Sequence, residues 1–218
     1  MPNNSGGLNL DRLLVSLKKD KINNIMRAKS LNLIEVASSN IKNLYLIKDI
    51  VLVLVFAVLT GLSAQIKVEI GTVPITMQTF IVLLSGVLLG SKKGALSQIS
   101  YLFMGLVGFP LFARGGGIGY FFSPTFGYIL GFISASYLVG FLIEKGWARE
   151  IKKSILILLI GETVIYLFGL SWLSSFVGFN RVLILGFYPF ILGDFLKLLL
   201  IIPFLPLGRE KNNIYDER

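Results

Sequence analysis

Six apolar runs follow one another along residues 50–206, and short polar or glycine-rich breaks separate them. Each run has, or nearly has, the length of about 20 residues that a helix needs to cross roughly 30 Å of hydrocarbon. The pattern predicts six membrane-spanning helices at residues 50–65, 77–90, 94–111, 123–143, 154–175 and 182–206. The short second run, which ends at Gly90 before Ser91, Lys92 and Lys93, fits a tilted or half-inserted helix lining a cavity.

Residues 1–48 differ from the rest, because Asn, Lys, Ser and Leu are mixed there and eight basic residues stand against three acidic ones. No long apolar core follows the early charges, so a cleaved secretory signal is not expected. We predict a basic cytoplasmic tail at 1–48, a six-helix domain at 49–208 and a cytoplasmic C-terminal tail at 209–218. A weakly amphipathic helix through residues 22–47 would suit anionic lipid. An organellar transit peptide is the alternative interpretation of this tail.

The distribution of lysine and arginine predicts the orientation of the chain. With the N-terminus inside, 17 of these residues fall in inner segments. Only Lys67, Arg114 and Arg181 fall in outer loops, and Lys197 lies within a span. This positive-inside bias predicts that both termini face the cytoplasm and that the loop around Arg114 faces out. We therefore expect a multi-pass protein of the cell membrane.

The composition agrees with an all-α integral membrane protein. Hydrophobic residues make up 54% and charged residues 15% of the chain, against about 45–50% and 25% in soluble domains. The net charge of +9 would indicate nucleic-acid binding only if basic residues formed a face beside groove-reading elements. Here they lie between apolar runs, so the lipid bilayer is the expected partner and nucleic acid is not.

The chain contains neither cysteine nor histidine. This excludes disulfides, thiol nucleophiles, imidazole bases and the commonest zinc ligands. A membrane enzyme would have only Asp194, Glu162, Lys197 and tyrosines for acid–base chemistry, so we do not expect an enzyme. No phosphate-binding loop is present either, and no ATPase activity or cofactor is expected in this chain.

Two charges lie one helical turn apart in the last apolar run, "YPFILGDFLKLLL" at residues 188–200. A lone Asp or Lys at the centre of a membrane costs roughly 2.5–3.5 kcal/mol. Asp194 and Lys197 are three residues apart, so they share one helix face and partly neutralise one another. We expect that face to turn inward and to contact a polar ligand. The alternatives are an ion pair that fixes helix register, or a lysine that snorkels to the inner surface.

The segment "PLFARGGGIGYFFSPTFGY", residues 110–128, is rich in glycine. Gly115, Gly116 and Gly117 let backbone amides approach a ligand, and Arg114 supplies a fixed positive charge. The segment matches neither a P-loop nor the dinucleotide-binding glycine pattern. It predicts a flexible external lid over a binding cavity, with a plain flexible connection as the alternative.

Four further polar side chains fall within the predicted spans. Gln78 follows Pro74 at the mouth of the second span, and it either bonds another helix or faces a cavity. Glu162, Tyr166 and Trp172 on the fifth span are open to the same two interpretations. Because Glu162 starts that span close to the inner surface, we expect it to be a solvated charge at the membrane edge.

Small residues recur four apart and allow close approach of helices in lipid. Such spacing indicates packing inside the bundle or a docking face for a partner membrane protein. Docking is most plausible on the first span. The pairs are Ala57 and Gly61, Gly86 and Gly90, and Gly127 and Gly131.

Residues 73–132, which begin "VPITMQTF" and end "FSPTFGYILGF", resemble the BioY family of biotin-transport S components. The resemblance continues through "IYLFGLSWL" at 165–173 and "YPFILGDFLKLLL", and it covers nearly all of residues 50–205. It implies a six-helix S component of an energy-coupling-factor (ECF) transporter that captures biotin from outside. A membrane coupling subunit (the T component) and two ABC-type ATPase subunits would then supply the energy from ATP.

The resemblance also assigns roles to single residues. The glycine-rich loop would close over the ligand, and the last helix would give it polar contacts. The substrate-binding positions so implied are Asp194, Lys197, Arg114, Gly115, Gly116, Gln78 and Tyr128, while Ala57 and Gly61 stand where such proteins dock on the coupling subunit. The chain departs from the family pattern in three ways. Its N-terminal tail is longer than usual, Phe126 stands where a glycine is frequent, and Arg114 lies in a part of the loop that varies in the family.

Biotin fits these side chains chemically. Asp194 can accept hydrogen bonds from the N–H groups of the cyclic urea of biotin, and Lys197 can donate a hydrogen bond to the urea carbonyl. Tyr101 and Phe112 would cover the thioether ring, and Arg114 or loop amides would hold the carboxylate, although the opposite orientation is also consistent. The alternatives to a biotin carrier are an S component for a different small vitamin and a structural membrane scaffold without a ligand.

Overall fold

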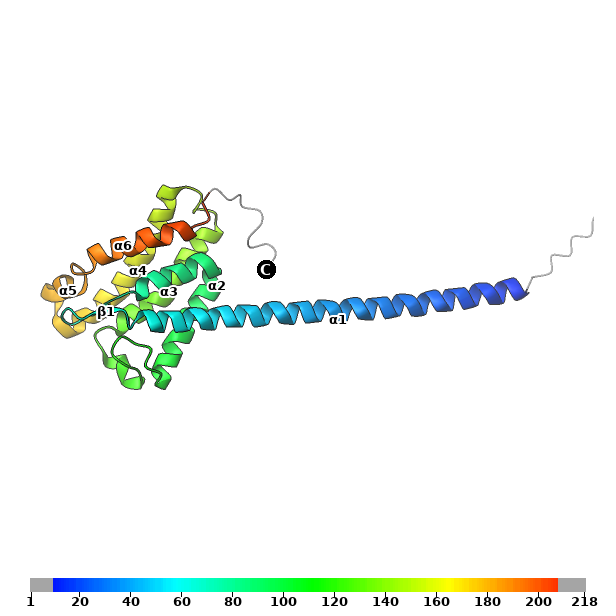
Figure 1. Cartoon of the computed structure of the whole chain (residues 1–218), viewed down its shortest axis with the longest axis horizontal. Helices are drawn as coiled ribbons and strands as arrows, with labels where there is room; N and C mark the ends of the chain where they lie inside the picture. The colour runs from blue at the N-terminus through cyan, green and yellow to red at the C-terminus, as the bar shows by residue number, and fades with distance from the viewer. Residues whose placement is uncertain (1–9, 208–218) are drawn as a thin grey trace, which may run out of the picture. The chain divides into compact units, whose positions relative to one another are not determined.

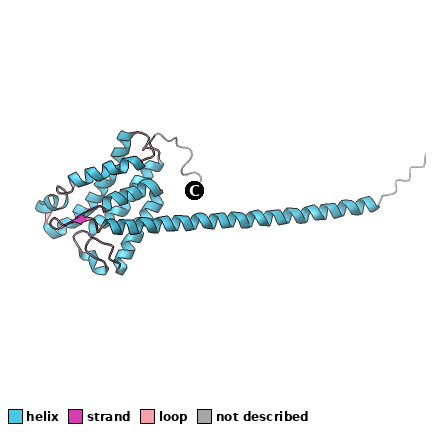
Figure 2. Ribbon diagram, viewed as in Figure 1, coloured by secondary structure: helices cyan, strands magenta, loops and turns pink. Residues whose placement is uncertain are grey.

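Helices make up most of the computed structural model, which describes residues 10–207 (Figures 1 and 2). Residues up to Lys48 and residues from Asp49 onward form two separate units. The elements are α1 (Leu10–Ser63), β1 (Lys67–Val68), β2 (Ile75–Thr76), α2 (Gln78–Val107), η1 (Ile118–Phe122), α3 (Phe126–Glu144), α4 (Ile151–Val177), α5 (Phe179–Gly186), α6 (Ile191–Ile201) and η2 (Ile202–Phe204).

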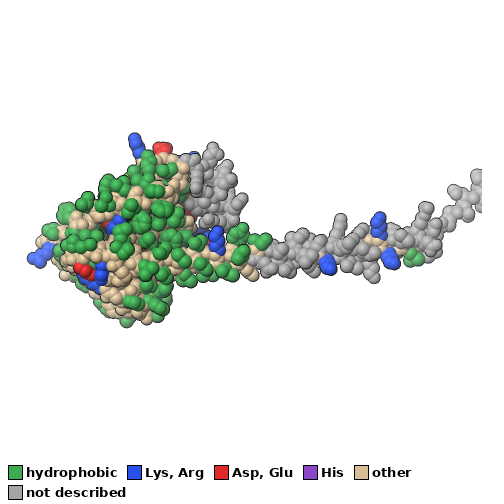
Figure 3. All heavy atoms as spheres, in the orientation of Figure 1, with side chains coloured by type: hydrophobic (Ala, Val, Ile, Leu, Met, Phe, Trp, Pro, Cys, Tyr) green, Lys and Arg blue, Asp and Glu red, His purple; other side chains and the backbone are tan. Residues whose placement is uncertain are grey.

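Four helical stretches in the described residues are long and apolar enough to cross a membrane. They are Ile41–Ser63, Gln78–Val107, Phe126–Glu144 and Ile151–Val177, and a bent pair made of Phe179–Gly186 and Ile191–Phe204 would add a fifth. The exposed residues of the bundle agree with a lipid environment, since hydrophobic side chains cover much of its visible face (Figure 3). The sequence pattern predicts six spans. The number differs because α2 covers two of the predicted runs and because the last predicted run is divided into the bent pair.

The helix α2 reverses direction at Gly90. Gly90 has φ 79° and ψ −178°, which breaks the helical conformation and which only glycine adopts readily. Gln78 Nε2 donates to Tyr101 OH at 2.6 Å, although 23 residues of straight helix would separate them by about 35 Å. Ser85 and Gln98 are joined in the same way, at 3.2 Å. Residues 78–89 and 91–107 are therefore two antiparallel helical halves, close to the predicted second and third runs.

The reversal is held against the end of α3. The Ser91 backbone N–H and hydroxyl both donate to the Glu144 carboxylate, each at 2.7 Å. This carboxylate satisfies N–H groups at the start of the second half of α2, as an N-terminal cap does. Gly140 packs so closely that a Cβ there would lie 2.4 Å from the Ser91 nitrogen. The turn and α3 therefore fix one another.

The predicted span at 182–206 is broken in the structure. The chain leaves the helical conformation between α5 and α6, and the two helices meet at 48°. Pro189 lies in this break. Proline lacks an N–H and disfavours helical backbone in the residue before it, here Tyr188, which explains why the helix stops. Asp194 consequently lies in the first turn of α6.

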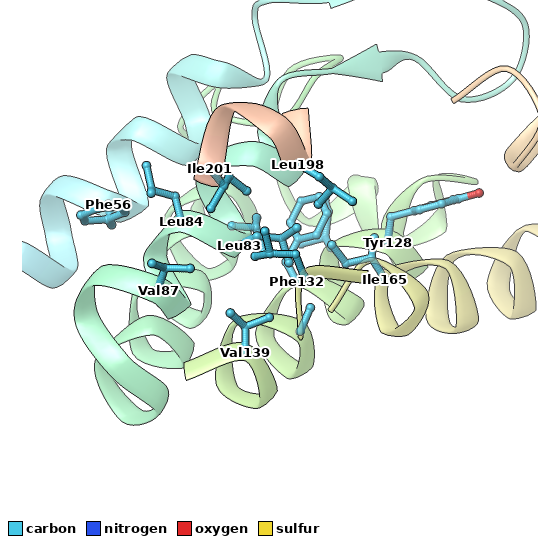
Figure 4. Close-up of a cluster of buried hydrophobic side chains, with 14 of the residues drawn as sticks. Phe56, Leu83, Leu84, Val87, Tyr128, Phe132, Val139, Ile165, Leu198 and Ile201 are labelled. Atoms are coloured by element: carbon cyan, nitrogen blue, oxygen red, sulfur yellow. The ribbon is translucent and has the colours of Figure 1, made fainter. Parts of the chain in front are cut away.

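The core of the bundle lies between α2, α3 and α4, where Leu83, Phe132, Val139 and Ile165 are buried together (Figure 4). Polar side chains also join these helices. Ser85 Oγ lies 2.8 Å from Ser136 Oγ, and Gln98 bonds Ser85 as described above. Because lipid offers such groups no water, bonds between helices satisfy them.

Small residues bring the helices together. A Cβ on Gly86 would lie 2.5 Å from a backbone oxygen of α3, and one on Gly127 would lie 2.2 Å from Trp172. Ala57 is fully buried, and a Cβ on Gly61 would meet Leu111 at 2.6 Å. All four residues therefore pack inside the bundle. A docking role for Ala57 and Gly61 stays a prediction, and these two residues are not themselves open to a partner here.

Candidate functional site

Polar side chains from α2, α4 and α6 meet in one cavity. Its empty space, which includes open solvent at its mouth, is about 540 Å³. The polar lining includes Gln78, Thr79, Glu162, Tyr166, Asp194 and Lys197. Ile129, Phe132, Ile165 and Phe190 form an apolar wall. Such a mixture suits a ligand with one polar head group and an apolar ring.

Asp194 and Lys197 face this cavity. Lys197 Nζ donates to Asp194 Oδ1 at 2.8 Å, and the two residues are only 5% and 6% exposed. Lys197 also donates to Thr79 Oγ1 at 3.1 Å, and Tyr166 donates its hydroxyl proton to Asp194 Oδ2. Lys197 therefore does not snorkel to the surface. Both charges are held in fixed positions by three helices, which is the arrangement that a polar recognition site requires.

Gln78 and Tyr101 line the same cavity. The Gln78 amide donates to Tyr101 OH, and its Oε1 accepts from Thr76 Oγ1 at 3.1 Å. Gln78 thus forms a hydrogen bond with the other helical half of α2 and also faces the cavity. Both interpretations of this residue from the sequence are therefore correct. Tyr128 also lines the cavity, and its hydroxyl donates to the Gly186 carbonyl at 2.9 Å.

The glycine-rich loop contributes Ala113 to the cavity wall, whereas Arg114, Gly115, Gly116 and Phe112 do not line it. Phe112 is fully buried and packs edge-on against Tyr101, with ring centroids 5.5 Å apart. It supports a cavity residue instead of covering the cavity. Gly116 allows close packing, because a Cβ there would lie 2.1 Å from the Phe109 carbonyl oxygen.

Arg114 ties the loop to the β1–β2 hairpin. Its guanidinium donates to Glu69 Oε2 at 2.6 Å and to the Thr72 carbonyl at 3.1 Å. Lys67 approaches Glu69 Oε1 at 3.2 Å and donates to the Ala113 carbonyl. We call Lys67, Glu69 and Arg114 the loop–hairpin contact. It joins two segments that contribute to the cavity wall, since Val73 and Pro74 of the hairpin connection line the cavity together with Ala113.

The loop–hairpin contact is exposed, so its charges are accessible to solvent. The Arg114 guanidinium, and after it Lys67, lower the pKa of Glu69 below its usual value by hydrogen bonding to the carboxylate. The contact is therefore ionised and intact at neutral pH. Arg114 has no free guanidinium face toward the cavity in this arrangement.

Thr79, Glu162 and Tyr166 are among the cavity residues that the sequence analysis did not assign to the ligand. The expectation that Glu162 is a solvated edge charge is wrong, because it is 6% exposed and lines the cavity. Its spacing of four residues from Tyr166 places both on one helix face, a signal that could have found them. Trp172 does not line the cavity, and its Nε1 donates to the Ser123 carbonyl at 3.0 Å.

The sequence of residues 29–211 matches the BioY family. A probable biotin transporter BioY of Pyrococcus horikoshii is 45% identical over 151 residues, which cover 69% of this chain and 89% of that protein. The biotin transporter BioY of Thermotoga maritima is 34% identical over 148 residues, covering 66% of this chain and 85% of that protein.

The fold has a solved relative as well. A crystal structure of the S-component for biotin from an ECF-type ABC transporter superposes with a TM-score of 0.67 and 25% identity. The match covers 74% of this chain and 90% of that one. The similarity in sequence and the similarity in fold therefore point to the same group of proteins.

Proposed function

Because this chain belongs to the BioY family, we propose that it is the high-affinity biotin-binding S component of an ECF-type vitamin transporter. The observation that carries the proposal is the Asp194–Lys197 pair, which lies buried in the wall of a cavity with both polar and apolar lining. Buried charges inside a membrane bundle are costly, and they usually mark a site of recognition or transport. The chain binds its substrate without changing it chemically.

The cavity supplies complementary groups for both parts of biotin. Asp194 accepts a hydrogen bond from a urea N–H, and Lys197 donates to the urea carbonyl with a proton not used toward Asp194 and Thr79. Tyr101, Phe132 and Ile165 cover the apolar ring system. The carboxylate tail then points toward the loop, where backbone amides meet it. Arg114 would meet it only by releasing Glu69.

The cavity permits tight binding. Nanomolar affinity corresponds to about 12 kcal/mol. Spread over about 16 heavy atoms of biotin this is roughly 0.75 kcal/mol per atom, below the ceiling of about 1.5 for small ligands. Such efficiency requires a closed and dry pocket. The loop–hairpin contact is the element that holds the pocket closed.

Energy for import comes from partner subunits. A membrane coupling subunit and two ABC-type ATPase subunits complete the transporter and use ATP, since this sequence carries no phosphate-binding loop. Six crossings of the cell membrane follow if the two antiparallel halves of α2 each count as one and the bent pair, Phe179–Gly186 with Ile191–Phe204, also counts as one. Both termini then face the cytoplasm, in accord with the 17 basic residues assigned to inner segments.

A binding titration tests this proposal. The full chain, purified in detergent, is titrated with biotin by calorimetry, and labelled biotin is then competed with other small vitamins. We expect one saturable site with nanomolar affinity that only biotin-like compounds compete for. A chain that binds another vitamin more tightly, or no small molecule at all, would overturn the assignment.

A further inference from the structure

Glu162 is the one cavity carboxyl that the described residues leave incompletely bonded. Its side chain lines the cavity and is 6% exposed. Its Oε1 is buried and has no hydrogen-bond partner within residues 10–207. An unsatisfied buried acceptor is unfavourable, and proteins rarely keep one without a compensating function. The missing donor must therefore come from what fills the cavity.

The neighbouring side chains have their donors directed elsewhere. Lys197 donates to Asp194 and Thr79. Tyr166, one turn from Glu162 on α4, donates to Asp194, and Tyr128 donates to the Gly186 carbonyl. The cavity thus presents two carboxyl groups, from α4 and α6, beside a single lysine that is already paired with one of them.

The shape of a cyclic urea requires two separate acceptors. Its two N–H groups lie on opposite sides of the carbonyl and point away from one another. One carboxylate can therefore accept from one N–H but cannot reach both, which corrects the expectation from the sequence that Asp194 accepts from the two N–H groups. If Asp194 accepts a hydrogen bond from the first N–H, as in the proposed function, a second acceptor is needed on the other side of the ring. Among the described residues that line the cavity, Glu162 has a buried acceptor atom without a hydrogen-bond partner.

We propose that Glu162 is a specificity-determining contact residue that accepts a hydrogen bond from the second N–H of the ligand head group. This inference rests on the proposed function and deepens it. The site then selects head groups that carry N–H donors on both sides of a carbonyl. A head group with a methylated nitrogen or an ether oxygen at the second position would leave Glu162 unpaired, and buried unpaired polar groups give strong discrimination.

The test combines three variants with three ligands. The full chain is prepared as wild type, Glu162→Gln and Glu162→Ala, with Thr163→Val as a control, because Thr163 is exposed on the same helix and bonds only the Leu159 carbonyl. The ligands are biotin and the two N-methyl biotins, in which one or the other urea nitrogen carries a methyl group. Size-exclusion profiles and thermal midpoints establish that each variant is folded.

We expect Glu162→Ala to weaken biotin binding by at least about tenfold and Glu162→Gln by a smaller factor, since the amide oxygen still accepts without charge. One N-methyl biotin, and only that one, should bind Glu162→Ala more tightly than it binds wild type, because the variant removes the unpaired carboxyl and leaves room for the methyl group. Thr163→Val should match wild type with all three ligands. A purely structural role for Glu162 would not produce this exchange of preference.

Three results would overturn the inference. If wild type binds biotin tightly and both Glu162 variants bind all three ligands as wild type does, Glu162 makes no contact while the proposed function stands. If wild type itself fails to bind biotin, the proposed function and this inference fail together. If Glu162→Ala does not fold, the shape-matched Glu162→Gln variant provides the test. The inference is rejected if this variant binds biotin as tightly as wild type does and shows the same relative affinities for the methylated ligands.

Discussion

Replacing Asp194 with asparagine removes one charge from the cavity while keeping the side-chain shape. In the wild-type protein this carboxylate accepts hydrogen bonds from Lys197 at 2.8 Å and from the Tyr166 hydroxyl. The Asp194→Asn variant leaves Lys197 charged, buried and without its counter-ion. It also offers the ligand a neutral acceptor where a charged one stood. We expect a loss of biotin affinity and a loss of stability, with different origins.

The two effects have separate magnitudes. A hydrogen bond to a charged group contributes about 1.5–3 kcal/mol, against about 0.5–1.5 kcal/mol for a neutral pair. Together with the lost positioning of Lys197, at least about 2 kcal/mol of binding energy is lost, which is roughly thirtyfold in affinity. Removing one partner of a buried ion pair destabilises a fold by about 3–5 kcal/mol. The stability loss should therefore appear even without ligand.

A second variant separates these effects. Asp194→Asn combined with Lys197→Met removes both charges, and uncharged replacements of buried pairs are often neutral for stability. The thermal midpoint of the unliganded double variant should recover most of the loss seen with Asp194→Asn alone. Its affinity for biotin, measured by calorimetry in detergent, should stay low. Unchanged affinity in the single variant would refute the assigned role of Asp194, and recovered affinity in the double variant would show that the charges serve stability alone.

Two other predictions concern the loop and the reversal in α2. Arg114→Ala should raise the dissociation rate of biotin, by less than about tenfold because an exposed ion pair is weak. The pKa of Glu69 is lower in the folded chain than in the unfolded chain, where a glutamate has a pKa of about 4.3. The loop–hairpin contact is therefore fully present above this unfolded-state pKa, and it is lost as the pH falls through the lower pKa of the folded chain. The dissociation rate should thus be flat from about pH 8 to 5 and rise below about pH 4, and Glu69→Gln should abolish that rise. Gly90→Ala should lower stability by about 1–3 kcal/mol because of the positive φ, whereas Gly119→Ala, in open space, should leave the thermal midpoint unchanged.

The sequence predicted the parts of the site that depend on local spacing. Asp194 and Lys197 share a helix face by their separation of three residues, and the cost of charges in lipid indicates that this face turns inward. The reversal at Gly90 was also signalled, because an apolar run stops there before Lys92 and Lys93. These inferences need only the periodicity of a helix and the polarity of its surroundings.

Contacts between residues far apart in the sequence cannot be predicted from local spacing. Arg114 is predicted at the ligand because it supplies a fixed positive charge in the glycine-rich segment and matches a loop position of the family, yet its partner Glu69 lies 45 residues earlier. Glu162 was assigned to the membrane edge from its distance to basic residues, although the packing of α4 against α3 and α6 buries it. The break at Pro189 was overlooked because apolar residues continue on both sides of it.

The break before α6 has an electrostatic consequence for the acid that follows it. Asp194 lies in the first turn of α6, and its backbone N–H bonds the Phe190 carbonyl at 2.8 Å. The N-terminal end of a helix carries a partial positive charge, which favours a carboxylate there. In a continuous helix the same residue would sit at mid-length and gain nothing from the dipole. Interrupting the span thus gives the anion a second source of compensation besides its lysine, in the manner of the half-helices that surround substrates in many carriers.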